Sequence, residues 1–411
     1  MKKKPIIRFS QIKNVVLIIF LVVLSGAIGF RVGVQRSLPL IPRASAQTDL
    51  SLFWGVWQKL EERYLDSSVL DSEQMIYGAI KGMVESLGDP YTAYFSPQDN
   101  KVNKEDLNGE FGGVGIQLGY KDSVLAVVSP LENTPASRAG VKAGDLILKI
   151  IDESNNIDKD TEGISLPEAV KLIRGKEGSS VVLTLLRDEQ SPFEVSLVRD
   201  RIVVPSLTSE WIEQGGKKIA YIHLLQFSEV MYAQWEDWVN EVLAQSNSSD
   251  FEGVILDLRN NPGGFLEASV YIASEFLSSG VIVEQKGADE YNQVYRVGRQ
   301  GNLLDTPLVV LVNRGSASAS EILAGALKYY KRGKVIGQQT FGKGTVQEPD
   351  EFPDGSGLHV TIARWLLPSG DNIHKQGIEP DIKVEAGENS SEDEDEILQK
   401  GIEVLLSKDS Q

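Results

Sequence analysis

The sequence of 411 residues contains no cysteine and only three histidines. Without cysteine there is no disulfide, no thiol nucleophile, no lipid-modified cysteine and no thiolate metal site. No carboxylate motif accompanies His223, His359 or His374, so we expect each histidine to be structural. We expect neither a metal nor a cofactor. A catalytic hydroxyl in this chain would therefore need a group other than histidine to take its proton.

Positive charge is also scarce, because 58 Asp and Glu outnumber 41 Lys and Arg and leave a net charge of -17. Nucleic-acid binding depends mainly on Lys and Arg neutralising phosphates, so this balance argues against a nucleic-acid partner. The basic residues that cluster are N-terminal: Lys2, Lys3, Lys4, Arg8 and Lys13. A basic flank at that position is typical of a membrane-targeting segment.

An uncharged apolar run, residues 15–30, follows this flank. It is slightly shorter than the hydrocarbon core of a bilayer, and extension to residue 34 with Arg31 snorkelling would let it span. Ala44-Ser45-Ala46 resembles a signal-peptide cleavage site but lies farther downstream than usual. We predict an uncleaved single-pass anchor in the cytoplasmic membrane, with a cleaved signal peptide as the alternative. In both cases the folded part is extracytoplasmic.

Two amphipathic helical patterns follow a short linker. Residues 50–66 carry apolar side chains at i, i+3 and i+4 spacing, and residues 72–87 repeat the pattern until Gly88-Asp89-Pro90 breaks it. We expect a small helical subdomain here. An exposed apolar face could equally serve a homodimer.

The remaining chain has a β-rich part and a mixed part. From residue 109 short alternating strands frame one amphipathic helix at residues 165–175. After residue 192 longer apolar runs alternate with helices at residues 231–245 and 267–277, as in a mixed α/β core with partly parallel strands. An acidic run at residues 385–396 predicts a solvated linker before a last helix.

These changes predict an α+β chain of six segments, and the length fits two or three folded units. The segments are a cytoplasmic tail and anchor (1–34), a linker (35–50), a helical subdomain (51–98), a β-rich domain (99–189), an α/β core (190–385), and an acidic linker with a C-terminal helix (386–411).

Ser316, Ser318 and Ser320 alternate in the stretch NRGSASASEILAGAL, between a buried strand and a helix. The first N–H groups of a helix lack intrahelical partners and carry the positive end of the dipole, so such a turn can stabilise an oxyanion. Serine is also a favoured N-cap, and spacing alone does not choose a nucleophile among the three. The stretch does not match G-x-S-x-G and gives no support for a hydrolase nucleophile elbow.

Lys343 stands between two glycines, and Gln347 follows on the same face if the segment is extended. Lysine acts as a base only when burial lowers its pKa. A neutral partner suits that need, because a carboxylate would raise the pKa. A surface lysine in a turn is the alternative. A phosphate loop is not supported, because Gly344 stands where Ser or Thr is required.

The stretch DLRNNPGG, residues 257–264, ends another buried strand. Its paired glycines allow close backbone approach, which would suit a second oxyanion donor. Ordinary turn chemistry explains them as well.

Together these stretches closely resemble the carboxyl-terminal processing proteases, or tail-specific proteases, a family of exported serine peptidases. The resemblance covers about residues 53–384 and also includes SLGDPYTAYFSP, GGVGIQL, AGVKAGDLILKI and TIARWLLPSGDNIHKQGIEPDI. It implies a PDZ-like domain at residues 99–189 and a crotonase-like (ClpP/crotonase) protease core at residues 190–385. Leu367 departs from the family's frequent Thr, which leaves catalysis alone but could alter a nearby loop.

The resemblance implies a Ser/Lys dyad. Ser318 would be the nucleophile and Lys343 the general base, with Gln347 orienting the base. The amides of Ala319 and Gly264 would form the oxyanion hole.

The resemblance further implies that the PDZ-like domain binds the C-terminal tails of substrates. Its carboxylate-binding loop would consist of Gly112, Gly113, Val114, Gly115 and Ile116. The adjoining strand edge would accept the peptide by β-augmentation. Arg174, at the end of the PDZ helix, would contact the protease domain, with a solvated arginine as the alternative.

The resulting prediction is an exported, membrane-anchored serine endopeptidase that cuts proteins near their C-termini. Its partners would be protein substrates, the membrane and a second copy of the chain. A catalytically silent PDZ scaffold is one alternative, but the presence of Ser318, Lys343 and Gln347 speaks against it. A crotonase-type acyl-CoA enzyme is another, which the PDZ-like insert and the acidic chain disfavour.

Overall fold

The computed structural model describes residues 48–407 except 122, 132, 188–190, 289–290 and 385–394. The predicted membrane anchor and nearly all of the predicted acidic linker lie outside the described residues. Within the described part, no helix combines the length and the apolar character that a membrane span requires. The chain divides into two compact units, residues 1–76 and residues 77–411.

The first unit contains helix α2 (Ser51–Arg63), the short 3-10 helix η2 (Ser67–Val69) and the start of α3 (Ser72–Glu85). Both predicted helical patterns are therefore helices. No residue of α2 is buried, and Leu52, Trp54 and Val56 leave 78%, 58% and 51% of their surface exposed. The apolar stripe of α2 thus remains open to solvent.

A strand and a helix connect α3 to the β-rich domain. Strand β1 (Ala93–Phe95) follows the break at Gly88-Asp89-Pro90 and precedes helix α4 (Pro97–Asn108). Ser96 caps α4, and Gly109 ends it in the left-handed conformation that glycine adopts readily. β1 pairs antiparallel with β18 (Gly357–Leu366), so residues that precede the β-rich domain join a sheet of the core.

The β-rich domain contains a sheet with strand order β3-β4-β5-β7-β8, while β6 pairs with β5 and β2 pairs with β9. Leu125, Ile147 and Leu183 are fully buried in its core, against the amphipathic helix α6 that the sequence predicts. The elements are β2 (Glu110–Gly113), β3 (Ile116–Lys121), β4 (Val124–Pro130), α5 (Pro135–Arg138), β5 (Leu146–Asp152), η3 (Glu153–Asn155), β6 (Ile157–Asp160), α6 (Leu166–Ile173), β7 (Ser180–Leu186), β8 (Phe193–Val198) and β9 (Asp200–Val203).

The α/β core is built on a six-stranded sheet with the order β10-β11-β12-β15-β16-β19. Its pairings are parallel except for β10 with β11, as the partly parallel prediction requires. The elements of this layer are β10 (Leu207–Gln214), β11 (Lys217–Leu224), α7 (Met231–Gln245), β12 (Phe251–Asp257), α8 (Leu266–Phe276), β15 (Leu308–Val312), α9 (Ala319–Tyr329), β16 (Lys334–Gly337), β19 (Ile382–Lys383) and α10 (Glu396–Leu406).

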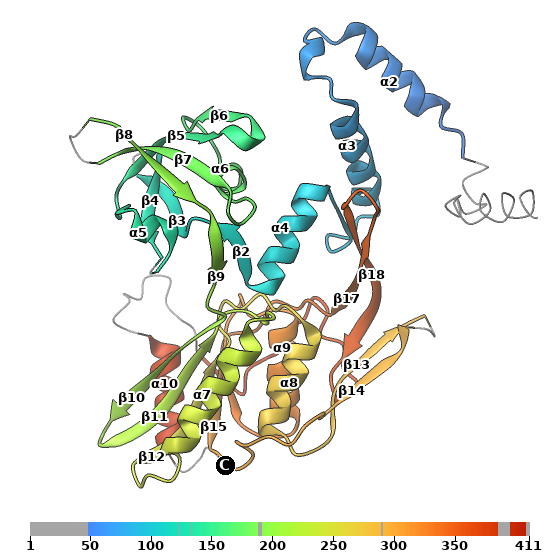
Figure 1. The fold of residues 1–411 in the computed structure, drawn as a ribbon. Coiled ribbons are helices and arrows are strands. Elements are labelled where there is room, and N and C mark those ends of the chain that lie inside the picture. Colours follow the sequence, from blue (N-terminus) through green and yellow to red (C-terminus); the bar gives the residue numbers. More distant parts are fainter. Residues whose placement is uncertain are drawn as a thin grey trace, which may run out of the picture. The chain divides into compact units, whose positions relative to one another are not determined.

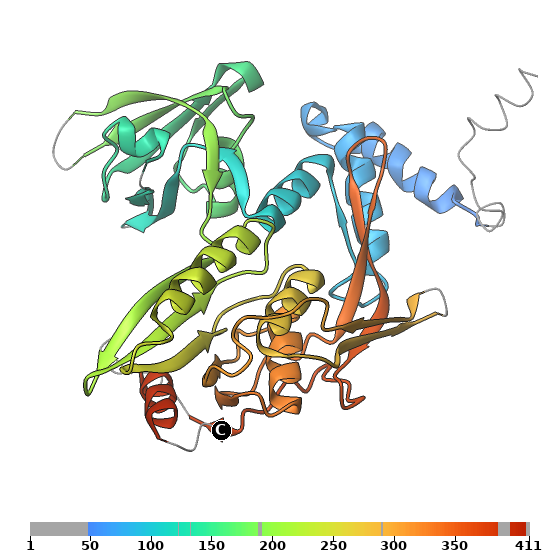
Figure 2. The same cartoon turned by 60° about the horizontal axis from the view of Figure 1, so that its bottom comes forward.

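Helices cover both faces of this sheet, with α7, α8 and α9 on one side and α10 on the other (Figures 1 and 2). Successive residues of a strand point to opposite faces, so Val254 and Leu256 of β12 pack with α7 to α9 while Ile255 packs with α10. A strand buried on both faces must be apolar throughout, which explains the continuous apolar runs in the sequence.

A second sheet stands beside the first. It contains β1, β13 (Val281–Gly287), β14 (Gln293–Arg296), β17 (Thr345–Glu351) and β18. β18 pairs with β17 and also with β1 and β13. The pairing of β17 with β18 brings the residues that follow Lys343 next to those that pair with β1.

Candidate active site

Three of the stretches singled out in the sequence lie at one edge of the core sheet. β12, β15 and β16 are parallel neighbours, so their C-terminal ends lie together. Residues 258–264 follow β12, residues 313–318 follow β15 and residues 338–344 follow β16. Stretches far apart in the chain therefore form one site, as expected for an open α/β sheet.

Ser318 stands directly before α9, which begins at Ala319. Its backbone has φ 55° and ψ -115°, a conformation that residues other than glycine rarely adopt. Such strain costs about 1–3 kcal/mol and persists only where the surroundings enforce it. Ser318 thus occupies a sharp strand-to-helix turn, although G-x-S-x-G is absent.

The other two serines hold this turn in place. Ser316 donates its hydroxyl to the Leu258 carbonyl (2.8 Å), and Ser320 donates to the Asn261 carbonyl (2.9 Å). Both are fully buried, whereas Ser318 is partly exposed. Of the three serines, only Ser318 presents an accessible hydroxyl.

Two backbone amides beside Ser318 have the properties of an oxyanion hole. A Cβ atom on Gly263 would lie 2.8 Å from the Ser318 Cβ and 3.0 Å from the Ala319 nitrogen, so only glycine allows this contact. Among the described residues, the amides of Ala319 and Gly264 donate no hydrogen bond. Two unpaired donors next to a serine can stabilise an oxyanion.

Glu321 joins the serine turn to the lysine loop, a role that the sequence reasoning missed. Its fully buried carboxylate accepts hydrogen bonds from the amides of Ser318 (2.9 Å), Gly342 (2.7 Å) and Lys343 (2.9 Å) and from the Thr340 hydroxyl (2.5 Å). Burial raises the pKa of Glu321, and these hydrogen bonds act against that rise. The signal that could have found it is the capping-box pattern S-x-x-E at residues 318–321.

Lys343 has the environment that the sequence argument requires of a base. Burial lowers the pKa of Lys343, and the negative charge of Asp89 offsets only part of that decrease. Its Nζ lies 5.2 Å from the centre of the Tyr91 ring. Among the described residues its ammonium forms no hydrogen bond or ion pair, and so none with Ser318 or Gln347.

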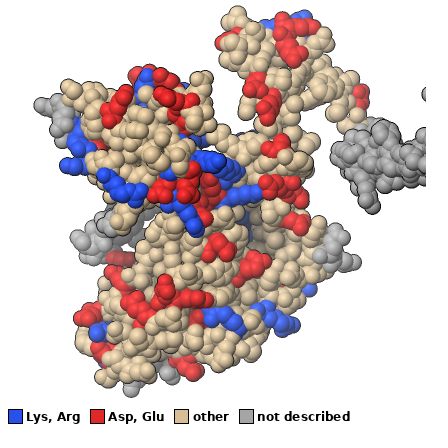
Figure 3. Space-filling view, in the orientation of Figure 1, with Lys and Arg blue, Asp and Glu red and all other residues tan. Residues whose placement is uncertain are grey.

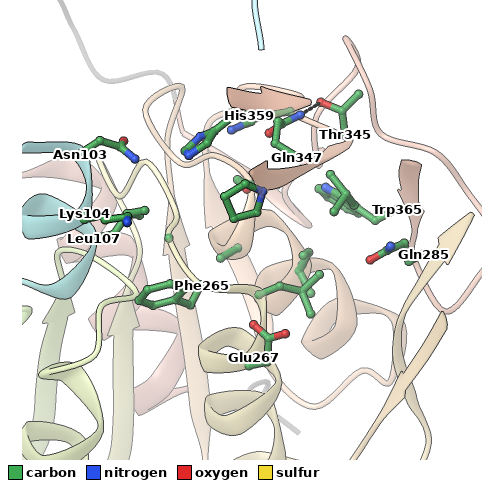
Figure 4. A pocket seen from close by; sticks show the side chains of 18 of the residues that line it. Asn103, Lys104, Leu107, Phe265, Glu267, Gln285, Thr345, Gln347, His359 and Trp365 are labelled. Atoms are coloured by element: carbon green, nitrogen blue, oxygen red, sulfur yellow. Dashed lines mark hydrogen bonds between the residues drawn. The ribbon is translucent and has the colours of Figure 1, made fainter. Parts of the chain in front are cut away.

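Gln347 is held by two threonines. Its carboxamide nitrogen donates to the hydroxyl of Thr345 (3.0 Å), as Figure 4 shows, and to that of Thr361 (3.1 Å). Both amide hydrogens are then used, which leaves the carbonyl oxygen for a donor such as Lys343. The shared-face argument needs correction, because Lys343 precedes β17 and the register shifts between Val346 and Gln347. Strand alternation therefore does not place them on one face, but both residues line the same cavity.

A cavity of about 580 Å³ contains the predicted site residues Ser318, Ala319, Gly264, Lys343 and Gln347 among its lining. Its other walls come from α4, α8, β13, β14, β17 and β18 (Figure 4). Large apolar side chains contribute to the lining: Leu107, Phe265, Leu266, Ile322, Val346 and Trp365. The cavity can therefore take an apolar side chain beside the serine.

Two of the three histidines lie near this cavity, which the sequence did not indicate. His359 is in the lining, and burial together with the nearby charge of Lys343 lowers its pKa. The His374 ring contacts that of Tyr91, with 6.2 Å between their centres. His223 bonds to the Arg259 carbonyl (3.0 Å). Within the described residues, no group of His, Asp and Glu side chains is arranged to hold a metal.

The predicted carboxylate-binding loop is only partly a loop. Gly112 and Gly113 belong to β2 and pair with β9. Val114 and Gly115 connect β2 to β3, and among the described residues their amides donate no hydrogen bond. The part of the predicted loop that lies outside β2 is therefore Val114 and Gly115, with Ile116 as the first residue of β3.

Arg174 is mostly buried rather than solvated, with 18% of its side chain exposed. It forms an ion pair with Asp106 of α4 (2.8 Å) and stacks on the Phe111 ring at 3.8 Å. Basic side chains gather in this region beside acidic ones (Figure 3). The contact of Arg174 is thus with α4, whose Lys104 and Leu107 line the cavity.

Comparison with known proteins matches three parts of the chain to families. Residues 218–384 match peptidase family S41, residues 42–99 match the activating protease CtpB N-terminal domain, and residues 127–187 match the PDZ domain. Among solved structures, a photosystem II D1 C-terminal processing protease is 28% identical and has a TM-score of 0.49, covering 87% of this chain and 97% of that one.

Two curated relatives are similar over most of the chain. A carboxy-terminal-processing protease of Bartonella bacilliformis is 35% identical over 87% of this chain and 82% of its own length. The carboxy-terminal processing protease CtpA of Bacillus subtilis is 37% identical over 77% of this chain, which spans 65% of that relative. From this similarity and the match across the core, the chain belongs to peptidase family S41, as a PDZ-containing hydrolase of the carboxy-terminal-processing protease group.

Proposed function

We propose that this peptidase is an exported, membrane-anchored serine endopeptidase that uses Ser318 and Lys343 to cut proteins near their C-termini. The observation that carries the proposal is that a partly exposed, strained serine, two unpaired amides and a lysine of lowered pKa line one cavity. A nucleophile, two oxyanion donors and a base are the groups that serine acyl transfer requires, which supports the proposal.

In the proposed reaction, the Ser318 hydroxyl attacks the scissile carbonyl while the neutral amine of Lys343 takes its proton. The amides of Ala319 and Gly264 stabilise the oxyanion. Lys343 then protonates the leaving amine, and an acyl-enzyme remains on Ser318. Water, deprotonated by Lys343, hydrolyses that ester and restores the serine.

The neutral form of Lys343 is favoured by burial and by a partner without charge. In the reaction, the carbonyl oxygen of Gln347 would accept a hydrogen bond from the amine, and a neutral carboxamide does not stabilise the ammonium as a carboxylate would. Because Lys343 forms no ion pair within the described residues, no charged contact has to break before its amine approaches Ser318.

Substrate tails would bind along β3 of the PDZ domain. The free amides of Val114 and Gly115 suit a terminal carboxylate, and the edge of β3 suits main-chain pairing. Ile116 and Leu118 of β3 and Leu166 of α6 are partly exposed apolar side chains beside this edge. An apolar C-terminal residue would contact them.

The test is cleavage of an unstructured protein by the full chain in detergent, with cut positions located by mass spectrometry. We expect cuts near the C-terminus, and hydrolysis about tenfold faster for an apolar tail with a free carboxylate than for an amidated or acidic one. Ser318→Ala is the control for contaminating proteases. No hydrolysis of any substrate would refute the peptidase assignment, while equal rates for free and amidated tails would refute tail recognition alone.

We propose that residues 15–34 anchor the chain and that α2 contributes to a homodimer. The basic flank and uncharged run support the anchor, and the open apolar side chains of Leu52 and Val56 support association. We expect the chain to fractionate with membranes and to migrate as a dimer in detergent, and Leu52→Glu with Val56→Glu to shift it to a monomer. Release of the chain from membranes by carbonate would contradict the anchor, and a monomeric wild type would contradict the homodimer.

A further inference from the structure

We propose that Asp89 and Tyr91, which precede β1, position the Lys343 base and belong to the catalytic centre. The proposal rests on the proposed function of Lys343. It extends the centre beyond the core, because both residues lie outside residues 218–384, which match the peptidase family. Neither residue touches the reacting atoms, and each acts through Lys343.

A set of hydrogen bonds holds residues 89–92 against β18. The Thr361 amide donates to the Thr92 hydroxyl (3.1 Å), and that hydroxyl donates to the Asp89 carboxylate (2.7 Å). The other Asp89 oxygen accepts the Tyr91 amide (3.1 Å). Pairing of β1 with β18 continues this attachment, with Ala93 opposite His359. The segment is therefore fixed rather than merely adjacent.

The same attachment reaches the residue that orients the base. Thr361 lies opposite Gln347 in the pairing of β17 with β18, and its hydroxyl accepts a hydrogen bond from the Gln347 carboxamide nitrogen (3.1 Å). Burial acts to raise the pKa of Asp89, but hydrogen bonds from Thr361 and Thr92 outweigh it and lower that pKa. Asp89 is thus a carboxylate at neutral pH, and it shares Thr361 with Gln347.

Tyr91 provides a surface for the ammonium. The Lys343 Nζ lies 5.2 Å from the ring centre, within the range of a cation–π contact. The ring is partly buried, and the His374 ring meets it at an interplanar angle of 68°. A ring held in this way limits the positions of a long side chain that has no other partner among the described residues.

Asp89 differs from the other charged groups around Lys343. Glu321 is engaged by its four donors, and Lys104 pairs with Glu351 at 2.5 Å. Asp89 supplies the negative charge that acts against burial at Lys343. The titratable or charged groups that face Lys343 or line its cavity are Asp89, Tyr91, Lys104, Glu267, Glu321, Asp350, Glu351 and His359.

Asp89→Asn is expected to move the acid limb of the pH–rate profile to lower pH. A negative charge near Lys343 stabilises its ammonium, so removing that charge lowers the pKa of the base and leaves more neutral amine at a given pH. We expect a shift of about half a pH unit to one unit in kcat/KM for the full chain in detergent. Glu85→Gln, an exposed carboxylate on α3, is the matched control and should leave the limb in place.

Tyr91→Phe and Tyr91→Leu separate the ring from the hydroxyl. We expect Tyr91→Phe to retain activity within about threefold of the wild type, because the ring face remains. Tyr91→Leu should lower kcat about tenfold with little change in KM. Thermal unfolding of both variants controls for folding. Three results would overturn the proposal. One is an acid limb that stays in place or moves to higher pH in Asp89→Asn. The others are equal losses of kcat in Tyr91→Phe and Tyr91→Leu, or full activity in Tyr91→Leu.

These outcomes are distinct from failure of the proposed function. If Lys343→Ala keeps full activity, the dyad itself is wrong. Ser318 and Lys343 could instead prove essential while Asp89→Asn leaves the acid limb unchanged and Tyr91→Leu is fully active. In that case only the positioning role of Asp89 and Tyr91 is refuted.

Discussion

Ser318→Ala and Lys343→Ala are each expected to lower kcat/KM at least about 1,000-fold, because one removes the attacking oxygen and the other the group that takes its proton. Substrate binding should change little, since neither side chain lies at the edge of β3, where we propose that substrate tails bind. Steady-state cleavage of the unstructured substrate, with binding measured separately by fluorescence anisotropy, checks both statements. Activity near the wild-type level in either variant would refute the assignment of Ser318 and Lys343 as the catalytic dyad.

Ser320→Ala is the matched control for this experiment. Its hydroxyl is buried against the Asn261 carbonyl, so its loss should cost about 1 kcal/mol of folding stability and leave cleavage within a few-fold of wild type. A loss as large as that of Ser318→Ala would mean that turn geometry, not a nucleophile, explains the result.

The pH dependence follows from the same assignment. Only neutral Lys343 accepts a proton, so the rate should rise with pH through the pKa of this lysine, which burial places below its ordinary value. Lys343→Arg should be inactive across this range because a guanidinium stays charged. A rate that is flat from pH 5 upward would argue against lysine as the base.

Glu321→Ala is expected to cost at least about 3 kcal/mol of folding stability and to lower kcat/KM at least about 100-fold. It leaves four donors of the serine turn and the lysine loop without their acceptor in a buried site. Glu321→Gln should lose less, because one carbonyl oxygen remains. Chemical denaturation and cleavage rates measure the two effects.

Glu267→Gln provides the comparison for Glu321. Glu267 also lines the cavity but is exposed, so its replacement should leave stability within about 0.5 kcal/mol. If Glu321→Ala proved as mild as Glu267→Gln, the two loops would be held together by something other than this carboxylate.

Local patterns in the sequence indicated many of the helices and strands and all three motifs, but not strand β1 or helix α4. The apolar spacing of residues 231–245 predicts α7 over its full range, and Ser165 marks the start of α6. These features are local, because a helix needs only its own periodicity and caps. The S-x-x-E signal for Glu321 was present too, although its long-range partners were not readable from it.

The sequence by itself determined most of the core helices and buried strands, the shortage of histidine, and three stretches with the residue types of a serine peptidase. Only the tertiary structure decided which of three serines opens to the cavity, that Glu321 joins two loops, and that residues 89–92 reach Lys343. The physical reason is that these contacts arise where parallel strands end together and where β1 pairs with β18, and no local periodicity encodes such pairings.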